Sequence, residues 1–274
     1  MATFKTSDNL TLYYEDEGDG TPILCLPGLT RTTADFDYIT PHLQKVRLIK
    51  LDYRGRGKSD WDPNWRNYNL VVECRDVIEL LDHLGLERVA ILGTSRGGLL
   101  AMGLAMGAKN RLTGVALNDI GPVIEADGLS YIMSYLGRKP GSKNHVEAAR
   151  GLERGMPGFQ GVPFSRWMEE AVKHFVRKDD GLDFTYDPKL RAAVEEQGAQ
   201  VAPDLWPYFD ALNGIPLACI RGENSDLFSH ATLGEMQSRM PGMITATVVG
   251  RGHIPFLDEP EAVAALQTWV GALK

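Results

Sequence analysis

The sequence predicts an α/β fold with a mostly parallel central sheet and helices on both of its faces. Two observations carry this prediction: short continuous apolar runs suit strands buried on both faces, and amphipathic segments of helical period separate these runs. The apolar runs are residues 23–26, 46–51, 89–92, 115–117, 217–220 and 245–249. Alternation of this kind indicates an open sheet with right-handed crossover connections.

The other elements of the predicted core follow from residue order and periodicity. Residues 10–18 alternate apolar and polar side chains, which predicts a half-exposed strand in an antiparallel hairpin with the residues before it. Residues 69–84 place their apolar side chains on one helical face, and Gly85 ends that helix. Residues 99–106 are apolar nearly all round, which predicts a deeply buried helix, and residues 259–273 form a final amphipathic helix.

One long stretch interrupts this alternation. Between Pro122 and Ile215 no run is typical of a buried strand. The stretch instead contains helical patterns, as in HVEAARGLERGM, FSRWMEEAVKHFV and PKLRAAVEEQGA, together with many aromatic residues and methionines. An insertion of this length needs structure of its own. We therefore predict a core of residues 1–122 and 206–274, with a helical cap of residues 123–205 inserted into it.

Composition and charge narrow the class of protein. The 274 residues are 43% apolar, and 29 Lys and Arg against 36 Asp and Glu give a net charge of -7, which argues against a nucleic-acid or anionic-membrane partner. The three cysteines suggest no disulfide framework. The N-terminus lacks the apolar run of a signal peptide, and no apolar stretch is long enough to span a membrane. We expect a cytoplasmic protein that acts on a small molecule; its oligomeric state stays open.

Metal and cofactor chemistry are not expected. The six histidines are scattered along the chain, and no two of them have the spacing of metal ligands.

A candidate nucleophile lies between the apolar run of residues 89–92 and the predicted buried helix of residues 99–106. Gly93-Thr94-Ser95-Arg96-Gly97 matches the pattern G-x-S-x-G, the nucleophile elbow. Its glycines allow a strand to turn sharply into a helix, so that the serine hydroxyl projects from the end of the sheet. The pattern by itself also fits a glycine-rich connection, but the buried strand before it and the apolar helix after it favour a catalytic Ser95.

A nucleophilic serine needs a base and an acid that orients the base, in the chain order serine, acid, histidine. His253 is the predicted base, because it follows the last apolar run in VVGRGHIPFLDEP and is flanked by glycine and proline. The predicted acid is Asp226, in the turn after the strand of PLACIRGENSDLFS. Glu223 in the same loop and Asp119 at the end of an earlier strand are alternatives, and Asp119 is the stronger of the two.

Acyl transfer also needs hydrogen-bond donors for the developing oxyanion. We expect these to be the backbone N–H of Arg96, at the start of a helix, and that of Leu29, in the loop CLPGLTRTT where Gly28 allows a close approach. The Arg96 side chain has two interpretations. It binds a substrate carboxylate in the pocket, or it turns away to pair with a structural acid such as Asp119.

Over nearly its whole length the chain resembles enzymes of the α/β-hydrolase fold. The resemblance is carried by Pro27-Gly28-Leu29, DYRGRGKSD, the elbow at Ser95, RGENSD and GRGHIPFLDEP, in this order. It is closest to the esterase, lactonase and C–C hydrolase branch that carries a helical cap.

The resemblance implies a cofactor-free serine hydrolase that cleaves small esters or lactones through an acyl-enzyme. Alternatives on the same fold are a C–C bond hydrolase of a dicarbonyl ring-cleavage product, a cofactor-free haloperoxidase or perhydrolase, and a cofactor-independent oxygenase. A weakly catalytic ligand-binding protein is the alternative from another class.

Overall fold

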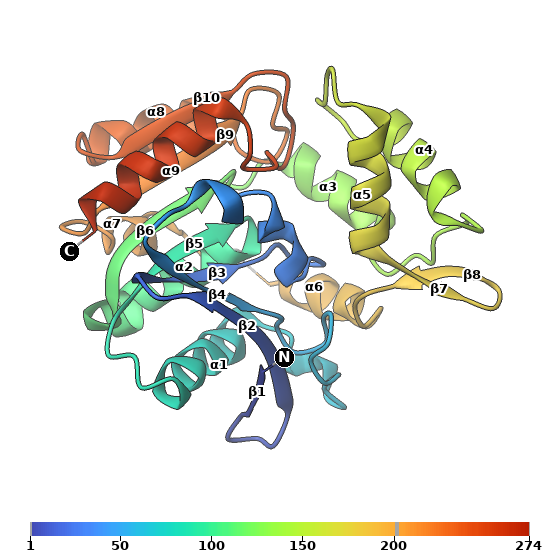
Figure 1. The fold of residues 1–274 in the computed structure, drawn as a ribbon, viewed down its shortest axis with the longest axis horizontal. Helices are drawn as coiled ribbons and strands as arrows, with labels where there is room; N and C mark the ends of the chain where they lie inside the picture. Colours follow the sequence, from blue (N-terminus) through green and yellow to red (C-terminus); the bar gives the residue numbers. More distant parts are fainter. Residues whose placement is uncertain (1, 201–202, 274) are drawn as a thin grey trace.

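The computed structural model describes residues 2–200 and 203–273. Its centre is an eight-stranded sheet with the strand order β1-β2-β4-β3-β5-β6-β9-β10, and helices cover the sheet (Figure 1). The strands are β1 (Ala2–Lys5), β2 (Thr11–Gly18), β3 (Thr21–Leu26), β4 (Val46–Leu51), β5 (Val89–Thr94), β6 (Leu112–Asn118), β9 (Leu217–Gly222) and β10 (Ile244–Val248). Each predicted apolar run therefore coincides with a strand, except that Val249 lies just beyond β10, and the predicted mostly parallel α/β sheet is confirmed.

The sheet changes from antiparallel to parallel near its first edge. Strand β2 pairs antiparallel with β1 and β4, and its register with β1 sets Ala2 opposite Tyr14. All pairs from β4 onward are parallel. Because parallel strands share one direction, the carboxyl ends of β3, β5, β6 and β9 meet at one edge, where ligand sites of open α/β sheets lie.

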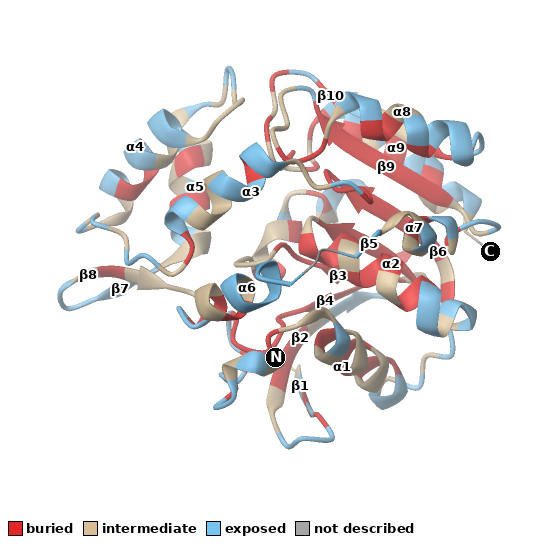
Figure 2. Ribbon diagram, turned by 180° about the vertical axis from the view of Figure 1, so that it is seen from behind, coloured by how far each residue is buried: buried red, intermediate tan, exposed pale blue. Residues whose placement is uncertain are grey.

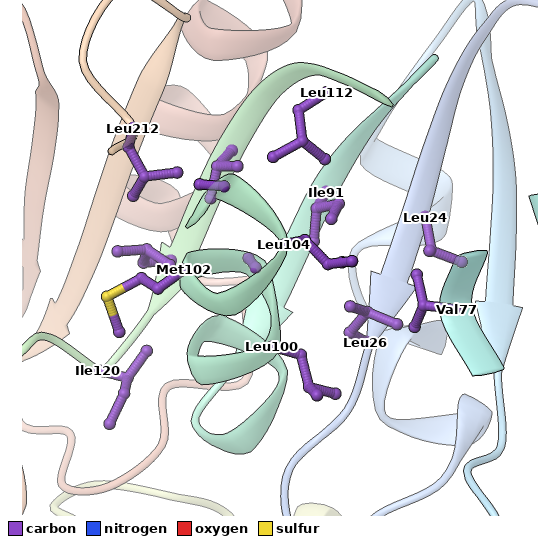
Figure 3. Packing of buried hydrophobic residues seen from close by; sticks show 14 of the residues in the cluster. Leu24, Leu26, Val77, Ile91, Leu100, Met102, Leu104, Leu112, Ile120 and Leu212 are labelled. Atoms are coloured by element: carbon purple, nitrogen blue, oxygen red, sulfur yellow. The ribbon is translucent and has the colours of Figure 1, made fainter. Parts of the chain in front are cut away.

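Helices lie on both faces of the sheet, as predicted. The helices of the core are α1 (Leu70–His83), α2 (Arg96–Ala108), α7 (Trp206–Asp210), α8 (His230–Arg239) and α9 (Pro260–Ala272), with short 3-10 turns η1 (Thr33–Asp37), η2 (Thr40–His42), η3 (Trp65–Asn67) and η4 (Lys109–Arg111). Alternate residues of one strand pack against opposite layers, since successive side chains of a strand point to opposite faces. Leu24 and Leu26 share a cluster with residues of α1, α2 and α8, and Figure 3 shows them beside Val77 of α1. Ile23 and Cys25, in contrast, pack with α9.

The segment between β6 and β9 forms a separate group of elements, here called the insert. It lies to one side of the sheet and is less buried than the sheet itself (Figures 1 and 2). It consists of α3 (Ala126–Tyr135), α4 (His145–Gly155), α5 (Phe164–His174), β7 (Phe175–Lys178), β8 (Gly181–Phe184) and α6 (Leu190–Gly198).

The hairpin of β7 and β8 was not expected from the sequence. Its strands are short and mostly exposed or half-buried, so they lack the continuous apolar run that marks a buried strand. The predicted cap boundaries at residues 123 and 205 stay a prediction, and residues 201–202 lie outside the described residues. Within the described residues, no helix has the length and apolar character needed to cross a membrane.

Candidate active site

Ser95 lies at a strained turn between β5 and α2. Its backbone has φ 49° and ψ -111°, a conformation that a non-glycine residue adopts only where its surroundings enforce it. The two glycines of the motif are required by close backbone contacts. A Cβ atom on Gly97 would lie 2.0 Å from the carbonyl oxygen of Leu26, and one on Gly93 would lie 2.5 Å from that of Gly97. The G-x-S-x-G spacing is therefore dictated by packing around the turn.

His253 joins Ser95 to a buried carboxylate. Its Nε2 lies 3.0 Å from Ser95 Oγ, and its Nδ1 lies 2.7 Å from Asp119 Oδ2. His253 lies in the loop after β10, and Asp119 directly follows β6. The three side chains form a continuous hydrogen-bonded chain of serine, imidazole and carboxylate, the arrangement that general-base activation of a serine requires.

The Asp119 carboxylate is fixed from several directions. The residue is fully buried and has a positive φ of 54°. Oδ1 accepts a hydrogen bond from the backbone N–H of Gly222 at 2.7 Å, and Oδ2 accepts one from the Ser225 hydroxyl at 2.6 Å. These donors, from the last residue of β9 and from the loop after it, orient the carboxylate toward His253.

The choice of Asp226 as the acid beside His253 is wrong in this structure. The side chain that reaches toward His253 from this loop is Ser225, which hydrogen-bonds to Asp119, while Asp226 lines the neighbouring pocket. Glu223 is also displaced from this role, since its carboxylate accepts the Gly250 N–H at 2.9 Å. The sequence does place Asp119 directly after a predicted strand. It does not show that β6 pairs with β5, and this pairing is what places Asp119 next to the nucleophile elbow.

The two predicted oxyanion donors lie beside Ser95. Leu29 follows Gly28, and a Cβ atom on Gly28 would lie 3.9 Å from Ser95 Cβ. Arg96 is the first residue of α2, where an N–H has no acceptor within the helix and the helix dipole favours negative charge. Among the described residues, neither the N–H of Leu29 nor that of Arg96 donates to a backbone acceptor in a turn or loop. Both groups are thus available to a ligand, and their catalytic role remains a prediction.

The side chain of Arg96 points away from the pocket, so the prediction that it binds substrate is wrong in this structure. It is 8% exposed, and its Nε donates to Glu73 Oε2 at 2.6 Å. The other oxygen of Glu73 accepts from Arg56 Nη1 at 2.7 Å. Burial opposes ionisation of Glu73, yet the guanidinium groups of Arg56 and Arg96 hold its pKa below the usual value. The second interpretation of Arg96 therefore fits, with Glu73 rather than Asp119 as the acid.

Sequence reasoning missed Glu73 although a signal was present. Glu73 and Asp76 are buried and lie on the same face of α1 as Val77 and Leu80. Charged residues on a buried helical face are rare unless they are paired. Two acids within that face therefore indicate partners such as Arg56 and Arg96 on the elements packed against α1.

A cavity of about 260 Å³ opens beside Ser95 and His253, between the core and the insert. The insert supplies most of its apolar and aromatic walls, including Tyr131, Ile132, Tyr135, Met156, Phe184 and Tyr186. Other aromatic residues of the insert pack against one another instead, as Phe159 and Trp167 do. The cavity is large enough for a small organic molecule and is mostly apolar, as ligand sites usually are.

Two arginines line this cavity, and they differ in their partners. Arg31, on the loop after β3, donates through Nη1 to Glu170 Oε2 at 3.0 Å and lies 3.7 Å from Asp35. Its Nη1 also contacts the imidazole of His174. Burial would lower the pKa of Arg31, but Asp35 and Glu170 raise it above its usual value. Arg31 therefore links the core to α5 through ion pairs. Arg138, which follows α3, is the second arginine of the pocket wall.

Comparison with known proteins places the chain in a family. A family model described as the alpha/beta hydrolase family matches residues 23–266. A 3-hydroxybutyrate-oligomer hydrolase of Cupriavidus necator is 33% identical over 272 residues, which are 95% of this chain and 92% of that protein. A 2-(acetamidomethylene)succinate hydrolase of Mesorhizobium japonicum is 24% identical over 92% of this chain and 88% of its own.

A solved structure agrees with these sequence matches. The crystal structure of an alpha/beta hydrolase from Novosphingobium aromaticivorans superposes with a TM-score of 0.92, at 37% identity over 99% of this chain and 98% of that one. The chain therefore belongs to the α/β-hydrolase family and is a hydrolase.

Proposed function

We propose that this hydrolase cleaves small esters or lactones through an acyl-enzyme on Ser95. The observation that carries the proposal is the hydrogen-bonded chain from Ser95 Oγ through His253 to Asp119, with distances of 3.0 Å and 2.7 Å. This chain ends at the wall of a cavity that can hold a small substrate. The 3-hydroxybutyrate-oligomer hydrolase adds support for an ester bond, since a hydroxy acid forms linear oligomers through esters.

The first half of the reaction transfers the acyl group to the enzyme. His253 Nε2 accepts the Ser95 proton as Oγ attacks the ester carbonyl, and Nδ1–H donates to Asp119, which stabilises the imidazolium. The N–H groups of Leu29 and Arg96 donate to the tetrahedral oxyanion. The C–O bond to the leaving alcohol then breaks, and the alcohol oxygen takes the proton from Nε2.

The second half returns the enzyme to its starting state. A water molecule gives its proton to His253 Nε2 and attacks the acyl carbon, and collapse of the second tetrahedral intermediate breaks the bond to Ser95 Oγ. The proton returns from His253 to Ser95, and the acid leaves. In this proposal the insert acts as a cap, because its aromatic residues form the wall of the cavity beside the reacting carbonyl.

Labelling with a fluorophosphonate, followed by assay on matched substrates, tests the proposal. The wild-type protein is expected to be labelled and to hydrolyse 4-nitrophenyl esters or lactones. Ser95→Ala is expected to lose labelling and at least about 10⁴-fold in kcat. Ser238→Ala is the matched control, because Ser238 is exposed on α8, and it is expected to behave as the wild type.

Two results would contradict the proposal. Undiminished labelling of Ser95→Ala would place the nucleophile elsewhere. Hydrolysis of a dicarbonyl ring-cleavage compound, with no turnover of any ester or lactone, would favour the C–C hydrolase alternative.

A further inference from the structure

We propose that the substrate is an anionic ester whose carboxylate binds Arg138, at the end of the pocket away from Asp226. Cleavage of this ester rests on the proposed function, whereas binding of its carboxylate to Arg138 does not. Four features of the described residues carry it: the partners of Arg138, the partners of Arg31, the position of Asp226 and the apolar face of α3.

Arg138 is a cation of the pocket wall without a protein partner. Arg138 is exposed to solvent at the rim of the cavity that Ser95 also lines, and its side chain forms no ion pair or hydrogen bond with residues 2–200 or 203–273. Two acidic side chains of the insert pair with other basic residues instead: Asp180 with Lys139 at 2.7 Å, and Glu195 with Arg191 at 2.8 Å. A free guanidinium presents parallel donors that match the two oxygens of a carboxylate.

Arg31, the other arginine of the wall, is not available in the same way. Its guanidinium is held between the buried carboxylates of Glu170 and Asp35. A ligand carboxylate that bound there would meet these two like charges at close range, which is unfavourable in a poorly solvated site. The geometry therefore points to Arg138 rather than Arg31.

Asp226 gives the pocket a negative end. The backbone carbonyl of Asp226 accepts the N–H of Gly128 in the first turn of α3, while Arg138 follows the last turn and donates its own N–H to the carbonyl of Tyr135. A helix rises 1.5 Å per residue, so the ten residues of α3 separate the two positions by roughly 15 Å. The two residues therefore lie at opposite ends of α3, and both line the cavity.

The catalytic group lies toward the negative end. Asp226 directly follows Ser225, whose hydroxyl contacts Asp119, the partner of His253. Repulsion by Asp226 and attraction by Arg138 orient a bound anion in the same sense, with the carboxylate away from the reacting carbonyl. Between the two ends, Tyr131, Ile132 and Tyr135 of α3 offer the cavity an apolar surface. The site therefore suits an ester with an apolar middle and a carboxylate several bonds from the scissile carbonyl.

Pairs of esters, each an anion and a neutral analogue that lacks the free carboxylate, test this inference. One pair places the acid on the alcohol side, 3-butanoyloxybutanoate and its methyl ester. The other places it on the acyl side, the mono-4-nitrophenyl ester of hexanedioic acid and 4-nitrophenyl hexanoate. The variants are Arg138→Gln, Arg138→Lys and the matched control Arg154→Gln, which removes the same charge from an exposed position on α4 of the insert.

Arg138→Gln is expected to lower kcat/KM for the anionic ester of at least one pair by about 10- to 100-fold, mainly through KM, the loss typical of a hydrogen bond to a charged group. The neutral esters are expected to change less than about twofold. Arg138→Lys should retain part of the preference, and Arg154→Gln should retain all of it. Equal effects of Arg138→Gln on charged and neutral esters of both pairs would overturn the inference.

Binding without turnover separates this inference from the proposed function. In Ser95→Ala protein, calorimetry with 3-butanoyloxybutanoate and with monomethyl hexanedioate is expected to show weaker binding of at least one anion when Arg138→Gln is added. That result would support the inference even if no ester were hydrolysed. Identical affinities for both anions with and without Arg138 would overturn it even if the neutral esters were good substrates.

Discussion

Two regions near Ser95 carry charged side chains: the floor, formed by Glu73, Arg56 and Arg96, and the wall along α3, with Arg138 and Asp226. The two regions differ in whether these side chains are paired with one another. On the floor, Arg56 and Arg96 share the two oxygens of fully buried Glu73. On the wall, Arg138 and Asp226 lie at the two ends of α3, and their side chains form no ion pair with any described residue. Buried charges require partners, whereas the exposed guanidinium of Arg138 and the half-buried carboxylate of Asp226 are solvated and stay accessible to a ligand. Nearness in sequence to the nucleophile therefore does not identify the arginine that faces the substrate.

The largest expected effect separates Asp119, the buried acid beside His253, from Asp226 of the wall. Asp119→Asn should lower kcat by about 10⁴-fold, because an amide opposite His253 Nδ1 favours the wrong imidazole tautomer. Asp226→Asn should change kcat for a neutral ester by less than about threefold, because this side chain does not contact His253. Steady-state assays with one neutral ester measure both variants. A larger loss in Asp226→Asn than in Asp119→Asn would restore Asp226 as the acid.

The next effect concerns the stability of the floor. Glu73→Gln should lower the free energy of unfolding by about 3–5 kcal/mol at neutral pH, because it leaves two buried guanidinium groups without a carboxylate. Denaturant unfolding measures this difference, with Glu153→Gln on an exposed position of α4 as the control. A loss no larger than that of the control would show that the floor does not depend on this ion cluster.

The same variant has a defined pH dependence. Because the pKa of Glu73 is lower in the folded protein than its ordinary value of 4.5, its carboxylate contributes stability above that value. The contribution is lost as the pH falls through the lowered folded pKa. The difference in unfolding free energy between wild type and Glu73→Gln should therefore be constant at neutral pH and shrink below about pH 4.5. A difference that grew toward acid pH would contradict the assigned direction.

Arg96→Met tests the contrast between the two arginines directly. The substitution removes one of the two cations that pair with Glu73, so it should lower the free energy of unfolding by about 1–3 kcal/mol. Its effect on kcat/KM should be the same for an anionic ester and its neutral partner, since the side chain does not face the cavity. Selective loss of the anionic ester in Arg96→Met would return the substrate-binding role to Arg96.

The smallest effect concerns a contact between the insert and the core. Both guanidinium Nη atoms of Arg166 on α5 donate to the carboxylate of Asp258 in the loop before α9. The pair is only partly buried, so Asp258→Asn should cost no more than about 1 kcal/mol, and the cost should fall at high salt. Thermal unfolding at low and high ionic strength measures it, and a salt-independent loss would indicate a packing role instead.

The fold and two members of the candidate site could be predicted from local sequence. Ser95 and His253 lie near glycines that close backbone contacts require. These glycines, at the ends of apolar runs, made both residues recognisable in the sequence. The acid could not be selected this way, because Asp119 and Asp226 both follow strands and only the sheet order brings Asp119 to His253. The pairing of Arg96 with Glu73 joins elements distant in the chain, and Arg138 reaches the cavity only through the packing of the insert against the core, so local pattern encodes neither.

The most direct test of the central claim is mass spectrometry of the protein quenched during turnover of a 4-nitrophenyl ester. An acyl-enzyme on Ser95 predicts a transient acyl adduct that maps to the peptide containing Ser95 and accumulates with the burst of 4-nitrophenol. The adduct should be absent in Ser95→Ala but present in Ser238→Ala. Turnover by the wild type with an adduct on another residue, or a burst of 4-nitrophenol with no adduct on Ser95, would contradict the account.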